Sequence, residues 1–326
     1  MTSRPGRVVA VDVGGSGLRL STYAGGLGPV LTAPGARVRP GGIDVAALVA
    51  DARALLAADG TGFGPQAATT EESGAAEEAP AVVVWSMRGL LFLADRSAVL
   101  AAVVAGLGAR RTVVVSDAVA NLVGATGRLG PGAVVAAGTG AVAFGTDFDG
   151  QWRRVDGWGH VLGDAGSAAA LGMAGLRAAL RAHDGLTDGS PTLLRAATDL
   201  LGPPEGWPRL VMAAPDAPER LASVAPLVTG AAESDPVALE LCRRAGTELA
   251  TSLLRAAEGL DRPVLCATGG LLTSAPVAAA LDDHLAAVGA HRSPAAGGAL
   301  EGAVHLGRHL RDTGTLPRHP AYLLVD

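Results

Sequence analysis

Short apolar runs that end at glycine-rich turns recur along this chain. One run covers residues 7–13 and another covers residues 132–137, and a further strand-like run follows each of them closely. Runs of this length that are rich in β-branched residues and bounded by glycine predict buried strands, here arranged as hairpins. The predicted strands are residues 7–13, 18–24, 29–33, 81–85, 112–115, 132–137, 141–146, 152–155 and 263–267.

Apolar positions spaced three and four residues apart predict helices between and after these strands. The predicted helices are residues 43–58, 96–107, 165–182, 191–201, 218–231 and 236–260. Residues 60–80 show no periodicity, which predicts a surface loop. Because the order of strand, hairpin and helix recurs once, we expect a duplicated α/β fold with domains at 1–125 and 126–326. Domain interfaces are favoured ligand sites, so we also expect an interdomain cleft.

Composition adds chemical limits to this picture. The chain has 326 residues, of which 49% are hydrophobic and only 3% aromatic, so a two-domain core must be built from small aliphatic side chains. All 26 basic residues are arginine. No lysine is therefore available for a P-loop or a Schiff base. The net charge of −5, with no arginine-rich face, argues against a nucleic-acid partner.

The N-terminal stretch and the one long uncharged segment predict a cytoplasmic protein. The first apolar stretch is short and ends at Asp12, unlike a signal peptide. The uncharged stretch over residues 264–281 is interrupted by glycine and proline, so we expect a strand, turn and helix there and no membrane span. Cys242 and Cys266 lack metal-ligand spacing, which favours buried free thiols, with a disulfide as the alternative.

Two glycine-rich turns are candidate phosphate-binding loops. The first, DVGGSG at residues 12–17, follows the first strand, and the second, AGTG at residues 137–140, follows the strand that opens the second half. Glycine lets main-chain N–H groups approach phosphate oxygens, and a Cβ at Gly138 is expected to block a ligand or to strain the turn. An ordinary tight turn is the alternative for each loop. The candidate phosphate-contacting residues are Gly14, Gly15, Ser16, Gly138, Thr139 and Gly140.

A third motif, SDAVAN at residues 116–121, lies where a strand gives way to a helix. Asp117 is a candidate general base that accepts a hydroxyl proton. The alternative is a helix N-cap, which is a common role for aspartate. Asn121 lies one helical turn later and is the only asparagine of the chain, which favours a polar role in substrate binding.

Two further motifs follow in the second half. In GWGHVLGDAGS, residues 157–167, Trp158 is suited to stacking on a sugar and Asp164 to accepting sugar hydroxyls. Core packing and an N-cap are the alternatives for these two residues, but a core segment gains nothing from so many glycines. After the strand at residues 263–267, Gly269 and Gly270 leave room for a base or ribose, and a plain strand-to-helix turn is the alternative.

The order of these motifs resembles the acetate and sugar kinase, heat-shock chaperone and actin superfamily. Within it, the chain is most similar to the N-acetylglucosamine kinase group of the BadF/BadG/BcrA/BcrD-type ATPase family, over residues 8–303. The resemblance implies duplicated actin-like, ribonuclease H-like domains and phosphoryl transfer from Mg²⁺-ATP to an amino sugar. It implies that Asp12 helps to place Mg²⁺, that Asp117 is the base, and that Gly269 and Gly270 flank the adenosine.

Three departures from that group fall on the substrate side. Ala165 stands where the group has glutamate, residues 35–37 replace an early asparagine that contacts sugar, and residues 85–89 replace a small Ala-Gly pair. Arg37 and Arg88 therefore favour an acidic acceptor as the alternative to a neutral amino sugar. An iron–sulfur activator ATPase and a non-catalytic ATP- or sugar-binding regulator are further alternatives.

The closing segment and the oligomeric state are less defined by the sequence. Residues 294–307 resemble the closing Gly/Ala-rich helix of the group, which we expect to pack back on the N-terminal domain. A homodimer is left open.

Overall fold

Two compact units make up the chain. The first contains Met1–Leu129 together with Ala295–Asp326, and the second contains Gly130–Pro294. The computed structural model describes residues 6–14, 17–35, 38–39, 42–59, 80–93, 95–212, 214 and 216–326. The predicted loop at residues 60–80 lies almost wholly outside the described residues. The division of the chain into domains at residues 1–125 and 126–326 stays a prediction.

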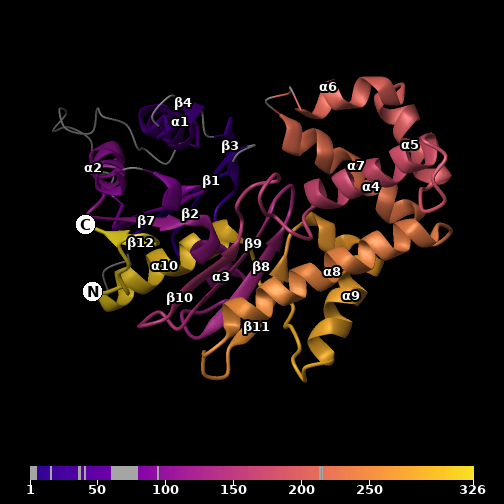
Figure 1. Cartoon of the computed structure of the whole chain (residues 1–326). Helices are drawn as coiled ribbons and strands as arrows, with labels where there is room; N and C mark the ends of the chain where they lie inside the picture. The colour runs from indigo at the N-terminus through magenta and orange to yellow at the C-terminus, as the bar shows by residue number, and fades with distance from the viewer. Residues whose placement is uncertain are drawn as a thin grey trace. The chain divides into compact units, whose positions relative to one another are not determined.

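The first unit is built on a six-stranded sheet in the order β12-β7-β6-β1-β2-β3 (Figure 1). Its strands are β1 (Val8–Val13), β2 (Leu18–Tyr23), β3 (Leu31–Ala33), β6 (Val82–Met87), β7 (Arg111–Ser116) and β12 (Leu323–Val325). Strands β1, β6 and β7 are parallel, whereas β2 and β12 run antiparallel to their neighbours. A separate ribbon pairs β4 (Val38–Arg39) with β5 (Gly42–Ile43). The carboxyl ends of the three parallel strands therefore meet at one edge of the sheet.

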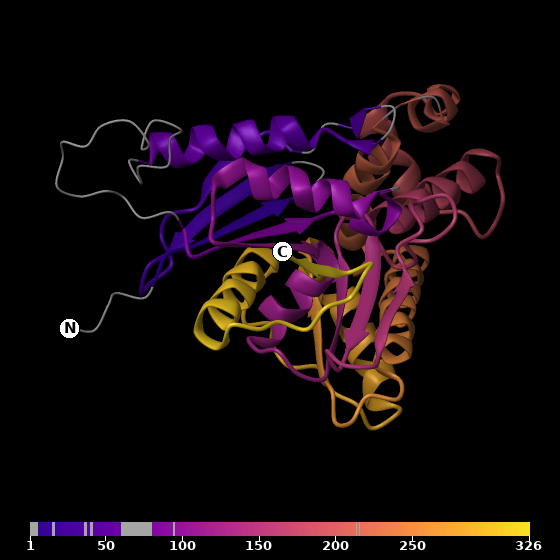
Figure 2. The same cartoon turned by 90° about the vertical axis from the view of Figure 1, so that its left-hand side faces the viewer.

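Helices cover both faces of this sheet, as Figure 2 shows. One face packs against α1 (Val45–Ala58) and α2 (Arg96–Leu107), and the other against α3 (Asp117–Thr126) and α10 (Ala299–Thr313). Val11, Val13 and Trp85 belong to the core beneath α1 and α2. Since side chains alternate along a strand, Asp12 and Ser86 point to the opposite face.

The second unit contains a four-stranded sheet in the order β10-β9-β8-β11. Its strands are β8 (Gly132–Ala137), β9 (Ala141–Thr146), β10 (Trp152–Asp156) and β11 (Val264–Thr268). The pairing repeats that of the first unit, because β8 is antiparallel to β9 and parallel to β11. Its helices are α4 (Ala168–His183), α5 (Pro191–Leu201), α6 (Trp207–Met212), α7 (Ala217–Ala231), α8 (Pro236–Ala257) and α9 (Ala275–Ala286).

Short 3-10 turns connect several of these elements, namely η1 (Leu90–Phe92), η2 (Pro204–Gly206) and η3 (Gly270–Thr273). Within the described residues, no helix is both long enough and apolar enough to cross a membrane.

The two cysteines are buried free thiols, so the disulfide alternative is wrong. Burial raises the pKa of the Cys242 thiol to about 11.

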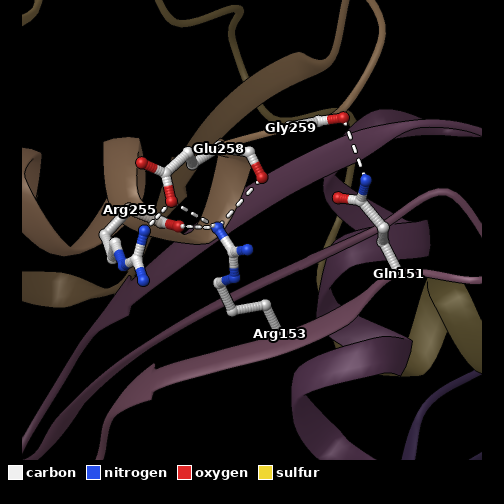
Figure 3. A network of polar contacts seen from close by, with 5 residues as sticks. All are labelled: Gln151, Arg153, Arg255, Glu258 and Gly259. Atoms are coloured by element: carbon white, nitrogen blue, oxygen red, sulfur yellow. Dashed lines mark hydrogen bonds and ion pairs between the residues drawn. The ribbon is translucent and has the colours of Figure 1, made fainter.

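A polar network attaches the second sheet to the end of α8 (Figure 3). Arg153 on β10 donates from Nη1 to the main-chain oxygens of Arg255 at 3.0 Å and Glu258 at 2.9 Å, and to the Glu258 carboxylate at 3.0 Å. The Gln151 side chain donates to the carbonyl oxygen of Gly259 at 3.0 Å. The last carbonyl groups of a helix lack intrahelical partners, and a cation there is favoured by the helix dipole. Arg153 therefore both caps α8 and fixes it to the sheet.

Candidate active site

The first candidate group is the buried carboxylate of Asp12 at the end of β1. Ser86 on β6 donates its hydroxyl to Oδ1 at 2.8 Å, and Nη2 of Arg19 on β2 contacts Oδ2 at 2.5 Å. Arg19 is the cross-strand partner of Asp12 in the β1–β2 register. A buried charge is tolerated when it is paired and hydrogen-bonded. Ser86 and Arg19 therefore hold the Asp12 carboxylate in a fixed orientation at the carboxyl edge of the sheet.

Asp117, the predicted base, is the first residue of α3 and is half-buried. Ser116 is the N-cap of this helix, since its Oγ accepts a hydrogen bond from the Val119 N–H at 3.3 Å. The Asp117 carboxylate instead accepts from the adjacent Ala118 N–H at 2.9 Å. The N-cap alternative for Asp117 is therefore wrong. A carboxylate in the first turn of a helix interacts favourably with the helix dipole.

Strand order brings these two carboxylates to one edge of the sheet. The register pairs Asp12 with Ser86 and Met87 with Ser116, so β6 separates the strands that end near Asp12 and Asp117. At ordinary strand spacing those two strands lie about 10 Å apart. Ligands of open α/β sheets bind outside the carboxyl ends of parallel strands. This edge is therefore a suitable place for a substrate.

The remaining predicted residues of the first unit lie near the same edge. Arg88 directly follows β6, its main-chain N–H donates to the Val13 oxygen at 3.0 Å, and its side chain is exposed. Asn121 is half-buried one turn along α3. In the first loop, Gly14 N–H donates to the Gly17 oxygen at 2.9 Å. The predicted residues outside the described part of the chain are Gly15, Ser16 and Arg37.

The second loop is a tight turn that packs on the start of α4. Gly138 N–H donates to the Gly140 oxygen at 2.9 Å, while the oxygen atoms of Gly138 and Thr139 accept from Ala168 and Ala169 at 3.0 and 3.1 Å. A Cβ at Gly138 would meet nothing within 4 Å, and its φ lies outside the left-handed region. The expectation that a side chain here strains the turn is therefore wrong, and only an approaching ligand would be blocked.

The Gly269–Gly270 turn lies beside this loop. Strands β8 and β11 are parallel neighbours, with Thr268 paired to Ala136, so both turns leave the same edge of the second sheet. Gly269 has φ of +109°, and a Cβ there would lie 2.2 Å from the Ala137 oxygen. Glycine is required at Gly269 for both reasons. Gly270 has open space around it.

Trp158 is exposed rather than packed in the core, so its core-packing alternative is wrong. Its side chain is 62% exposed, and the Arg154 guanidinium lies 4.6 Å from its ring centroid. Val161 and Leu162 in the same loop are also exposed. An indole stacked on one face by a cation keeps apolar area available for a ligand.

Asp164 joins this loop to the Gly138–Gly140 turn. It is buried with φ of +58°, and its Oδ1 accepts from the Gly159 N–H at 3.0 Å. A Cβ on Gly140 would lie 2.6 Å from Asp164 Oδ2, so the carboxylate packs directly on the turn. Ser167 caps α4 by accepting from Ala170 N–H at 3.1 Å, and the N-cap alternative for Asp164 is wrong.

Sequence reasoning missed Asp156 at the end of β10. Its carboxylate accepts from the main-chain N–H groups of Asp164 at 2.8 Å and Ala165 at 2.7 Å, and its φ is +59°. The available signal was an aspartate placed directly before the glycine that follows a strand. Asp156 therefore organises the backbone at Asp164 and Ala165.

The residues present fit a magnesium ion that arrives with a nucleotide. In the described part of the chain, no three His, Cys, Asp or Glu side chains gather as a metal site. Mg²⁺ nevertheless needs only one or two carboxylates when phosphate oxygens and water supply its other ligands. Asp12 offers one carboxylate, and the side chain of its partner Arg19 is 53% exposed.

Comparisons with known proteins show the family to which the chain is similar. The profile of the BadF/BadG/BcrA/BcrD ATPase family matches residues 69–306, well over half of the chain. An N-acetylmuramic acid/N-acetylglucosamine kinase from Clostridium acetobutylicum is 36% identical over 74 residues, which are 23% of this chain and 24% of that protein.

Two solved structures extend the likeness over more than nine-tenths of the chain. A candidate N-acetylglucosamine kinase from Chromobacterium violaceum is 25% identical with a TM-score of 0.67, covering 92% of this chain and 98% of that one. Another from Porphyromonas gingivalis is 17% identical with a TM-score of 0.71, covering 94% and 100%. These likenesses confirm the predicted actin-like ATPase fold.

Proposed function

This chain belongs to the BadF/BadG/BcrA/BcrD ATPase family, and on that premise we propose that it is an ATP-dependent kinase that phosphorylates a hydroxyl group of an amino sugar. The observation that carries the proposal is the pair of carboxylates at one sheet edge, with Asp12 buried at the end of β1 and Asp117 opening α3. We further propose that the glycine turns at Gly138–Gly140 and Gly269–Gly270 would bind the nucleotide through main-chain groups.

The proposed reaction is a direct phosphoryl transfer. Asp117 accepts the proton of the acceptor hydroxyl, whose oxygen forms a bond to the γ-phosphorus while the bond to the β–γ bridging oxygen breaks and ADP leaves. Asp12 would hold Mg²⁺, which supplies positive charge to the phosphate oxygens when bound. Gly14, Gly15 and Ser16 would contact the phosphates.

An amino sugar is the proposed acceptor class. The exposed ring of Trp158 offers an apolar face to a pyranose, and Asp164 and Asn121 offer hydrogen-bonding groups. The Clostridium relative is named as acting on N-acetylglucosamine and on N-acetylmuramic acid, which carries a carboxylate. Arg88 supports the acidic sugar as the second candidate, because within the described residues its exposed guanidinium makes no hydrogen bond or ion pair.

The test measures ADP release with glucosamine, N-acetylglucosamine, glucose and N-acetylmuramic acid. We expect turnover with an amino sugar that is lost when EDTA removes Mg²⁺. A preference for N-acetylmuramic acid that Arg88→Ala abolishes would favour the acidic acceptor. Binding of ATP and sugar without ADP release would contradict the kinase and favour a regulator.

Gly138→Val is expected to weaken ATP binding by at least about tenfold without loss of fold. A Cβ at this position has open space in the protein, so we expect the added side chain to interfere with a nucleotide held at this turn. Calorimetry measures the affinity. Gly150→Val is the matched control, because Gly150 is also a turn glycine with nothing within 4 Å. Equal ATP affinity in both variants and the parent would show that the turn is only structural.

A further inference from the structure

The end of β7, directly before Asp117, is held by the C-terminal segment of the chain. Strand β12 pairs antiparallel with β7, so that Leu323 lies opposite Val115. One residue further, the Ser116 N–H donates to the Tyr322 oxygen at 2.9 Å. Ser116 is also the N-cap of α3. The main-chain N–H of Ser116, directly before the proposed base, is therefore bonded to Tyr322, which is distant in sequence.

The same segment is anchored at the beginning of β7. Asp326 Oδ1 pairs with Arg111 Nε at 3.1 Å, and Oδ2 accepts from the Thr112 N–H at 2.9 Å. The Asp326 N–H in turn donates to the Thr112 oxygen at 3.2 Å. A further anchor is Arg96, whose Nε donates to the Pro320 oxygen at 3.1 Å. Residues 317–326, hereafter the C-terminal strap, are thus attached along the whole length of β7.

Placement of a general base tolerates little error. A misplacement of about 1 Å can cost roughly a hundredfold in rate, and catalytic groups need support from a second layer of contacts. β6 pairs with the other side of β7, so without the strap this side would be an unpaired edge. Strand edges and their ends open most readily. By pairing with this side of β7, the strap restrains the end of the strand that leads into Asp117.

We propose that the C-terminal strap is a positioning element for Asp117, with Asp326 as the residue that fastens it. This proposal rests on the kinase function proposed above. Asp326 forms its hydrogen bonds and ion pair with Arg111, Thr112 and Arg318, none of which is a candidate site residue. Its effect on catalysis must therefore pass through β7 and Ser116 to Asp117.

The test uses the full chain with Asp326→Ala. We expect kcat to fall about tenfold with little change in KM for ATP, because nucleotide binding does not depend on the strap. Asp312→Ala is the matched control, since it removes an aspartate ion pair with Arg311 on α10 in the same unit. A similar loss of kcat in both variants, or none in Asp326→Ala, would overturn the proposal.

A double-mutant cycle separates positioning from general weakening of the fold. In an Asp117→Asn background a strap that acts through the base has nothing left to position, so adding Asp326→Ala should change kcat by less than about twofold. If the double variant instead loses kcat by the product of the two single-variant losses, the strap does not act through Asp117. Arg111→Met removes the same ion pair from the other side and should give the same non-additivity.

Hydrogen exchange provides a readout that needs no activity. In Asp326→Ala the amides of residues 115–120 should exchange faster by about tenfold or more, while those of residues 138–140 and 268–270 stay unchanged. Unchanged exchange at residues 115–120 would overturn the strap's role. If the unmutated chain releases no ADP with any acceptor, the proposed kinase function fails, and this exchange experiment still decides whether the strap positions Asp117.

Discussion

Asp117→Asn is expected to lower kcat by about two to four orders of magnitude, the usual contribution of a general base. Asparagine keeps the shape of the side chain and its hydrogen bond from the Ala118 N–H, but its amide cannot take up the hydroxyl proton. ATP affinity should barely change, because the carboxylate is assigned to the acceptor. Steady-state ADP release measures kcat, and calorimetry measures ATP binding.

Asp95→Asn is the control for this substitution. Asp95 also begins a helix of the first unit, where it caps α2 by accepting from the Ala98 N–H at 2.9 Å. Asparagine is an equally good N-cap, so this variant should keep its turnover and stability. Near-normal kcat in Asp117→Asn would remove Asp117 from the reaction, whereas equal losses in both variants would point to a general electrostatic effect.

Among the substitutions proposed for this chain, Gly302→Ala should produce the largest loss of stability, about 3 kcal/mol in the free energy of unfolding. Helices α3 and α10 cross at glycine positions, and a Cβ at Gly302 would lie 1.8 Å from the Ala120 oxygen. The collision is with helix backbone, so the helices must separate, and overpacking of this kind typically costs 1–3 kcal/mol or more. Thermal and urea unfolding measure the change, and kcat should fall too because α3 carries Asp117.

Gly230→Ala is the matched helical control. Gly230 lies inside α7, and a Cβ there would meet nothing within 4 Å. Alanine is favoured over glycine in a helix by about 1 kcal/mol, so this variant should be slightly more stable. A Gly302→Ala protein as stable as the parent would contradict the close crossing of α3 and α10.

Local patterns predicted the regular elements well where both ends carry a chemical signal. The helix over residues 96–107 has the expected bounds, because Asp95 caps its start and Gly108 ends it with φ of +60°. Strands at residues 132–137 and 141–146 also match, since a strand buried in a sheet shows a continuous apolar run between turns. The strongest predictions therefore coincide with signals that are contained in a few consecutive residues.

Element ends set by backbone geometry were predicted less well. The helix expected from residue 165 begins at Ala168, because Gly166 has φ of +76° and Ser167 provides the cap. The helix expected to reach residue 260 ends at Ala257, since Glu258 is extended and Gly259 has φ of +84°. Apolar periodicity continues through such positions and cannot mark them.

Long-range pairing was outside the reach of the sequence. Strand β12 has only three residues and exists because β7 offers it an edge, so nothing local distinguishes it from a loop. The same limit applies to the site. The motifs identified Asp117 and Trp158, but the capping by Ser116 and the organising role of Asp156 depend on contacts that no local pattern states. The roles of the site residues remain predictions for the experiments above.

The path of the chain through the two units has a consequence for synthesis on the ribosome. The second unit is continuous, from Gly130 to Pro294, whereas the first needs Ala295–Asp326 to supply α10 and β12. Translation runs from the N-terminus, and domains fold as units when their residues have emerged. The first unit, whose synthesis begins first, is therefore completed only after the second unit. A nascent chain interrupted after residue 294 would carry the Gly138–Gly140 turn in a complete unit, but α3 and its aspartate would still await their supports.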